Sequence, residues 1–245
     1  MLFRSVSNEA GFGYYAGMFS GLESFGKEKA LPVLHAIVED PNYQARLLEV
    51  KGPRHEFDRA LRELAIIAIG ELGGEKSIPR LKKVMKVTAS SGLENEFGHL
   101  VVAIYRLGDR KPFQEFISLL EKEAESALSG DLKEDGYEKL FSIGLVQNRV
   151  GMRKAAEKTY SDLAERIGKE AGERPSDVYP DTLYNLACLR ALRGEKAEAI
   201  KLLRRSVEAG FRDRDWIEKD GDLASLRGEA AYRALMAEKA LFSEK

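Results

Sequence analysis

Residues 71–85, ELGGEKSIPRLKKVM, form the stretch from which the fold is predicted: the end of one helix, a glycine turn and the start of a second helix. Gly73 follows an apolar residue, and glycine often ends helices because it enters the left-handed backbone conformation without steric cost. Pro79 suits the start of a helix, where its missing N–H has no helical partner anyway. The apolar residues that follow recur at i, i+3, i+6 and i+7, as on one face of a helix: Ile78, Leu81, Val84 and Met85. The segment therefore predicts a helical hairpin.

The pattern recurs in residues 22–38 (LESFGKEKALPVLHAIV) and 105–120 (YRLGDRKPFQEFISLL), and internal repetition of this kind indicates a stacked architecture. The stripes of the second helices are Leu31, Leu34, Ile37, Val38 and Phe113, Phe116, Leu119, Leu120. The runs 64–69 and 100–105, which precede two of the glycines, are more apolar and favour helices packed on both sides. A buried strand is the competing interpretation of such short runs, and the helical stripes beside them argue against it.

The three glycines, Gly26, Gly73 and Gly108, are 47 and then 35 residues apart, and the excess lies in a predicted loop over 40–57. At this spacing the segments resemble HEAT-type repeats, helical hairpins of about 40 residues that stack into a superhelix. The resemblance covers about 13–125.

After a polar break at 129–131, residues 140–163 (LFSIGLVQNRVGMRKAAEKTYSDL) and 183–207 (LYNLACLRALRGEKAEAIKLLRRSV) resemble tetratricopeptide (TPR) repeats. Each has a small residue in both helices and a glycine at the turn: Gly144, Gly151, Ala156 and Ala187, Gly194, Ala199. The copies are 43 residues apart, and the length beyond the usual TPR spacing is assigned to a loop over 168–181 with Pro175 and Pro180.

The tail is similar to the closing segment of bacterial TPR arrays, and we expect it to cap the last hairpin, which has a face without a neighbour. Its covering residues are predicted to be Trp216, Leu223, Leu226, Tyr232 and Leu235. An EF-hand interpretation of Asp213, Asp215, Asp220 and Asp222 fails, because the fifth position counted from Asp213 is Ile217. These aspartates are expected to cap the tail helices instead.

Composition and motifs argue against several other classes of protein. The 245 residues hold 39 basic and 40 acidic side chains, and no basic stripe of the kind a nucleic-acid binder shows stands out. No apolar run reaches the roughly 20 residues of a membrane helix. His35, His55 and His99 lack ligand-like spacing and are expected at the surface or half-buried, whereas the single cysteine, Cys188, is expected to be buried. The string Gly11–Ala16 matches a dinucleotide-binding pattern without the preceding strand that such a site needs.

We identify no catalytic, cofactor or metal residue, and the predicted site is a partner-binding surface. It comprises Asn185, Arg190, Lys201, Arg204 and Arg205, and the arginines Arg193, Arg212 and Arg214 lie close by in the sequence. Such clusters are usually a solvated face, but an acidic peptide or protein could bind there. Asn185 occupies a position that some TPR domains use to grip a peptide's C-terminal carboxylate. The equivalent positions of the preceding repeat are Phe141 and Leu145, so this clamp is not implied.

The predicted fold is therefore all-α, a right-handed α–α superhelix with HEAT-like hairpins over 1–128 and TPR-like hairpins plus a helical cap over 132–245. The leading hypothesis is a non-catalytic, bacterial-type adaptor or scaffold that binds a protein or peptide segment in the groove of the solenoid. We expect no cofactor, no nucleic acid and no membrane partner. The alternative is a helical-repeat enzyme or small-ligand carrier with a pocket built from distant repeats. The chain as written predicts a soluble cytoplasmic protein, or a periplasmic one if a leader has been removed.

Overall fold

The computed structural model describes residues 26–40, 55–88, 94–170 and 176–242, and these residues form helices and turns without a strand. The predicted helix before Gly26, the string Gly11–Ala16 and residues 41–54 of the predicted loop lie outside the described residues. The end of the predicted loop, 55–57, is helical, because a helix begins at His55. Contacts between residues divide the chain into an N-terminal unit, Met1–Phe116, and a C-terminal unit, Ile117–Lys245. The all-α fold class predicted from the sequence is confirmed.

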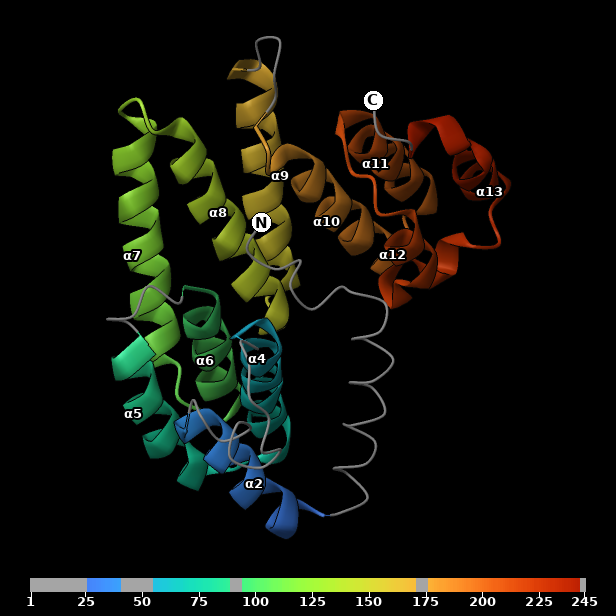
Figure 1. Ribbon diagram of the computed structural model, residues 1–245. Coiled ribbons are helices and arrows are strands. Elements are labelled where there is room, and N and C mark those ends of the chain that lie inside the picture. The colour runs from blue at the N-terminus through green and yellow to red at the C-terminus, as the bar shows by residue number, and fades with distance from the viewer. Residues whose placement is uncertain (1–25, 41–54, 89–93, 171–175, 243–245) are drawn as a thin grey trace. The chain divides into compact units, whose positions relative to one another are not determined.

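The N-terminal unit contains α2 (Lys27–Glu39), α4 (His55–Leu72), the short 3-10 turn η2 (Glu75–Ser77), α5 (Ile78–Thr88), α6 (Glu94–Arg106) and the first residues of α7 (Lys111–Leu128) (Figure 1). Helices α4 and α6 pack against each other, α2 lies on α4, and α5 lies on α6. The two apolar runs are helical and buried, because each lies in a helix with neighbours on more than one side: Leu64, Ala65, Ile66, Ala68, Ile69 and Leu100, Val101, Val102, Ala103, Ile104. The strand alternative for these runs is wrong.

The predicted stripes match the buried faces, with one exception. Leu34, Val38, Leu81 and Val84 are buried, but Leu119 is 51% exposed on α7. Pro79 and Pro112 stand second in α5 and α7, as predicted for a helix start. Pro32 does not, because α2 begins at Lys27 and the proline lies inside the helix.

The glycines of the N-terminal unit serve two different purposes. Gly108 has a φ of 111° and Gly26 a φ of 78°, conformations that favour glycine. Gly73 is not in this region, and the prediction that it ends its helix by a left-handed turn is wrong. A Cβ at Gly73 would come within 2.5 Å of the Ile69 carbonyl oxygen, so close approach requires glycine there.

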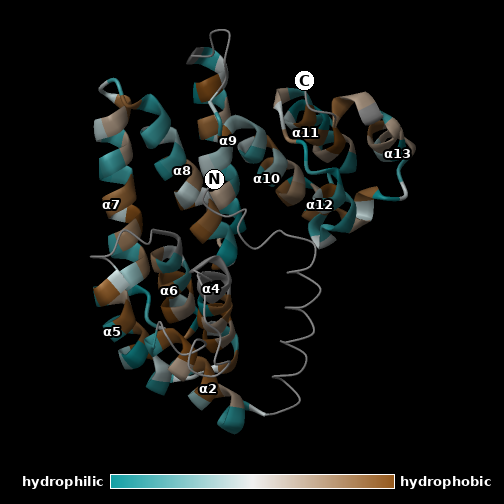
Figure 2. Ribbon diagram, in the orientation of Figure 1, coloured by the Kyte–Doolittle hydropathy of each residue, from teal (hydrophilic) through white to brown (hydrophobic). Residues whose placement is uncertain are grey.

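The C-terminal unit contains the rest of α7, two hairpins and a closing segment. The hairpins are α8 (Lys133–Arg149) with α9 (Arg153–Glu170) and α10 (Tyr179–Leu192) with α11 (Lys196–Ala209), and α10 also packs on α9. The closing segment contains α12 (Arg214–Lys219), the 3-10 helix η3 (Gly221–Leu226), α13 (Ala230–Ala237) and the turn η4 (Lys239–Leu241). Figure 2 shows hydrophobic and hydrophilic residues sharing helices such as α7 and α9, as expected where one face is packed and another exposed.

The two hairpins are built in the same way. Gly151 and Gly194 have φ values of 84° and 81°. Around each glycine two backbone N–H groups bond back to the helix end: Gly151 to Asn148 and Met152 to Gln147, then Gly194 to Ala191 and Glu195 to Arg190. This pattern caps the last carbonyls of a helix before a tight reversal. The predicted loop over 168–181 is shorter than expected, because α9 continues to Glu170 and Pro180 lies in the first turn of α10.

The closing segment covers α10 and α11 as predicted. Leu223, Leu226, Tyr232 and Leu235 are buried in one core with the two helices, and Trp216 is partly buried against it. Asp213 accepts the Trp216 N–H at the start of α12, and Asp220 accepts the Asp222 N–H at the start of η3. The capping roles predicted for Asp213 and Asp220 are thereby confirmed, and Asp215 and Asp222 lie in the first turns of the same two helices.

Candidate functional site

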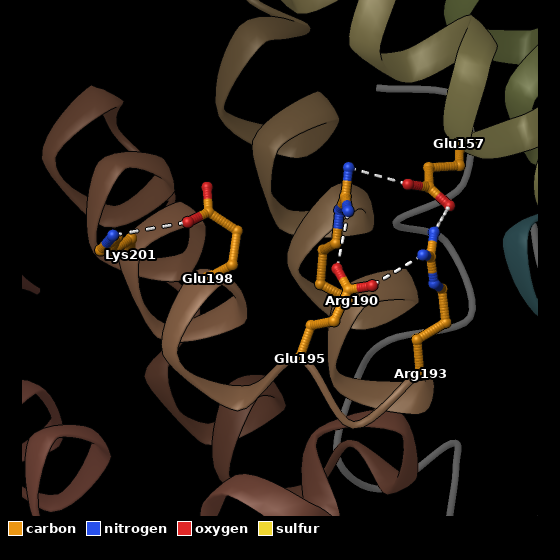
Figure 3. Close-up of polar contacts among 6 residues, drawn as sticks. All are labelled: Glu157, Arg190, Arg193, Glu195, Glu198 and Lys201. Atoms are coloured by element: carbon orange, nitrogen blue, oxygen red, sulfur yellow. Dashed lines mark hydrogen bonds and ion pairs between the residues drawn. The ribbon is translucent and has the colours of Figure 1, made fainter.

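The predicted partner-binding residues lie on α10 and α11. One of them, Arg190, belongs to a ring of four charged side chains. Arg190 donates to Glu195 at 2.6 Å and pairs with Glu157 at 2.8 Å. Arg193 pairs with the same two carboxylates at 2.6 and 2.7 Å. Figure 3 shows the two guanidinium groups alternating with the two carboxylates. The ring links α9 to α10 and to the turn before α11, and its four formal charges sum to zero.

Arg190, which the sequence predicts as a partner-binding residue, is already paired with carboxylates of the chain itself. Glu157 is 14% exposed and Arg190 28% exposed, so this pair is partly shielded from water. Hydrogen bonding to Glu195 raises the pKa of Arg190, and the same bond lowers the pKa of Glu195. A ligand carboxylate would have to displace Glu157 or Glu195 to reach Arg190. The geometry assigns this arginine to holding the two hairpins together.

The other predicted residues lie in different settings. Asn185 donates its side-chain N–H to the Asp181 carbonyl at 2.8 Å, one turn back on the same helix. Arg204 makes two hydrogen bonds to Glu238, at 2.5 and 3.1 Å, which fasten α11 to the end of the closing segment and raise the pKa of Arg204. Lys201 is 73% exposed, 3.5 Å from Glu198 (Figure 3), and Arg205 donates to the Tyr179 hydroxyl at 3.0 Å.

Of the neighbouring arginines, Arg212 donates to the Val207 carbonyl at the end of α11. Arg214 pairs with Glu218 at 3.0 Å and lies over the Phe242 ring at 6.0 Å. Arg190 and Arg204 of the predicted surface are therefore paired with carboxylates outside their own helices, and Asn185 is bonded to a backbone carbonyl. Lys201, which has Glu198 one turn away, and Arg205 are its exposed cations.

Residues that the sequence interpretation missed form a buried polar cluster in the N-terminal unit. Glu63, Thr88, Glu96 and His99 are each at most 3% exposed. Glu96 accepts the Thr88 hydroxyl at 3.0 Å and pairs with Arg62 at 3.1 Å, and His99 lies 3.9 Å from Glu63. The spacing in the sequence could have revealed this cluster. Glu63 stands three residues before the buried Ile66 and Glu96 four before the buried Leu100, so each shares a helix face with a core residue.

Two histidines contradict the sequence expectation. His35 and His99 are 3% exposed rather than superficial, because α2 and α6 turn these positions toward the packed faces. His35 Nε2 lies 2.9 Å from the Ser77 hydroxyl. Burial lowers the pKa of His35, and the neighbouring Arg80 lowers it further. The side chain of His55 lies outside the described residues.

Cys188 is buried as expected, beside a tyrosine and an aspartate. The Tyr184 hydroxyl donates to Asp220, and the Cys188 sulfur lies 3.6 Å from the same carboxylate. Burial raises the pKa of both Tyr184 and Cys188, and Asp220 raises both further. The thiol therefore stays protonated and unreactive at neutral pH.

Features of other site classes are sparse in the described part of the chain. No three histidine, cysteine, aspartate or glutamate side chains there are placed to hold a metal ion. A shallow depression on α9 is lined only by Asp162, Glu165, Arg166 and Lys169. None of the helices described has the length and apolar character needed to cross a membrane.

Comparison with known proteins gives no relative from which a function could be transferred. No protein-family model, curated protein or solved structure matches the chain.

Proposed function

We propose that this chain is a non-catalytic adaptor that binds a segment of another protein on the exposed faces of its stacked helical hairpins. The observation that carries the proposal is the construction of the C-terminal unit. Two consecutive hairpins share the same glycine turn 43 residues apart, pack through α9 and α10, and end in a closing segment. Stacked hairpins of this kind leave long solvated faces, which repeat proteins use for binding.

Tight packing between the helices of each hairpin supports a rigid binding platform. A Cβ at Gly144 would lie 2.5 Å from the ring of Tyr160, so α8 and α9 approach as closely as glycine permits. Ala187 and Ala199, the small residues of the second hairpin, are fully buried. A preorganised surface loses little conformational entropy when a partner binds.

The experiment is affinity capture with the full chain from a native lysate of the source organism. The captured protein is then purified and its binding measured directly. We expect one dominant partner that binds the purified chain with a defined stoichiometry. Recovery of background proteins only, by a chain whose helical circular dichroism shows it to be folded, would contradict the proposal.

The alternative, an enzyme or small-ligand carrier, has one observation in its favour. Glu63 and His99 form a buried pair of ionisable groups, an arrangement that is also found at functional sites. A screen of small molecules by thermal shift tests this function. A ligand that stabilises the native chain but not a Glu63→Gln variant would favour the alternative over the adaptor.

A further inference from the structure

Positive charge on α11 is distributed unevenly between paired and unpaired side chains. Lys196 pairs with Glu229 and Arg204 with Glu238, both in the closing segment. Arg205 is exposed, and its only partner among the described residues is the neutral Tyr179 hydroxyl. Within the described ranges, the partner of Lys201 is Glu198, at 3.5 Å, one turn back on the same helix. Glu208, the other acid of α11 near these residues, lies 3.9 Å from Arg204.

We propose that Lys201 and Arg205 are the recognition point for an acidic segment of the protein partner. The inference rests on the proposed adaptor function and names the chemistry of its partner. The two cations stand four residues apart on α11, so they lie on one helix face about 6 Å apart along its axis. Alternate side chains of an extended peptide are spaced by about 6.6 Å. A segment with acidic residues at every second position therefore places one carboxylate on each cation.

The hydrogen bond that Arg205 donates to the Tyr179 hydroxyl orients its guanidinium before any ligand arrives. One Nη2 hydrogen is bonded at 3.0 Å, which leaves further N–H groups of the planar guanidinium for a carboxylate. Arginine binds carboxylates through two parallel hydrogen bonds, and a preorganised fork loses less entropy in doing so. Lys201 contributes a mobile point charge beside this fixed donor.

A protein segment fits this surface better than a nucleic acid. Lys201 and Arg205, with Glu198 and Glu208 near them, are two separate positive groups rather than a stripe of positive charge. Nucleic acids are held by rows of phosphate contacts, and a chain with 40 acidic against 39 basic residues offers little general attraction to them.

The experiment selects binders from a displayed library of random peptides with the full chain as bait. A single-stranded oligonucleotide is tested alongside by fluorescence anisotropy. The test variant is Lys201→Glu with Arg205→Glu. The matched control is Lys158→Glu with Lys169→Glu on α9, two lysines that are 77% and 72% exposed and each paired one turn away. A milder variant, Lys201→Gln with Arg205→Gln, repeats the measurement if charge reversal disturbs folding.

We expect the selected peptides to be enriched in alternating acidic residues and their affinity to fall about tenfold or more in the test variant. The control variant should bind within about twofold of the wild type, and binding should weaken with added salt. Selection of neutral peptides that the test variant still binds would overturn this inference while supporting the adaptor function. Failure to select any peptide, or binding of the oligonucleotide alone, would overturn both the acidic-segment inference and the proposed adaptor function.

Discussion

The two units use similar hairpins but place their polar groups in opposite ways. In the N-terminal unit the buried polar residues include two carboxylates and two imidazoles: Glu63, Glu96, His35 and His99. In the described part of the C-terminal unit they are hydroxyls, and each bonds a backbone carbonyl, Thr182 to Val178 and Ser206 to Pro180. The described ion pairs of that unit join side chains that are at least 14% exposed, as in the ring around Glu157.

The difference predicts different responses to mutation. A buried charged group needs a well-placed partner of opposite charge. Removing one partner leaves the other charge unpaired where water cannot solvate it. A hydroxyl bonded to a carbonyl carries no such penalty. We therefore expect the N-terminal unit to be the more sensitive to single polar substitutions and to pH.

The largest expected effect is from Glu96→Ala. It removes the carboxylate that Arg62 and Thr88 share, with Arg62 16% exposed and Glu96 2% exposed. We expect the free energy of unfolding to fall by about 3 kcal/mol, measured by denaturant titration. Hydrogen exchange should locate the loss in α4 and α6.

The control for this variant is Glu71→Ala, which breaks the pair with Arg106. That pair is 57% and 34% exposed, so we expect a change of about 1 kcal/mol or less. Equal losses in the two variants would remove the basis of the comparison, because burial would then not distinguish the pairs.

Close helix packing allows the two units to be compared without charge. A Cβ at Gly70 would lie 2.9 Å from the Ala103 Cα, and one at Gly144 would lie 2.5 Å from the Tyr160 ring. We expect Gly70→Ala and Gly144→Ala each to lower the midpoint of thermal unfolding, with costs of about 1–3 kcal/mol from overpacking. The cost should be similar in both units. The added methyl group would meet backbone at Ala103 and a fully buried ring at Tyr160, and neither can move aside easily.

The control for the glycine variants is Gly228→Ala, where nothing lies within 4 Å of an added Cβ. It should leave the thermal midpoint nearly unchanged. A stabilised Gly144→Ala would show that α8 and α9 are not held at the distance seen here.

The sequence predicted the helices well because their signals are local. Apolar spacing, the glycine turns at Gly151 and Gly194 and the aspartate caps depend on residues a few positions apart. The pairing of charged side chains could not be predicted from the sequence, because their partners are distant along the chain. Glu157 lies more than 30 residues from the arginines it holds, and Arg204 is as far from Glu238. A count of basic residues along α11 therefore could not show that Arg204 is paired with a carboxylate while Arg205 is bonded to a neutral hydroxyl.

The smallest expected effect, and the sharpest test of the difference between the units, is the response to pH. All three histidines of the chain precede residue 117, so the C-terminal unit contains none. Burial holds the pKa of His35 below its usual value of about 6.5, and Arg80 acts in the same direction. The unfolded chain therefore binds a proton at His35 before the folded chain does. Stability from this residue is complete above about pH 6.5 and falls as the pH drops toward the folded value.

We expect hydrogen exchange in α2 and α5 to accelerate between pH 7.5 and pH 5.5, after correction for intrinsic rates, while exchange in α10 and α11 changes little. His35→Gln should reduce this dependence, because glutamine does not titrate and can still bond the Ser77 hydroxyl. An unchanged pH dependence in the variant would show that His35 is not its source. Equal acceleration in both units would show that the buried ionisable groups of the N-terminal unit do not make its stability more dependent on pH.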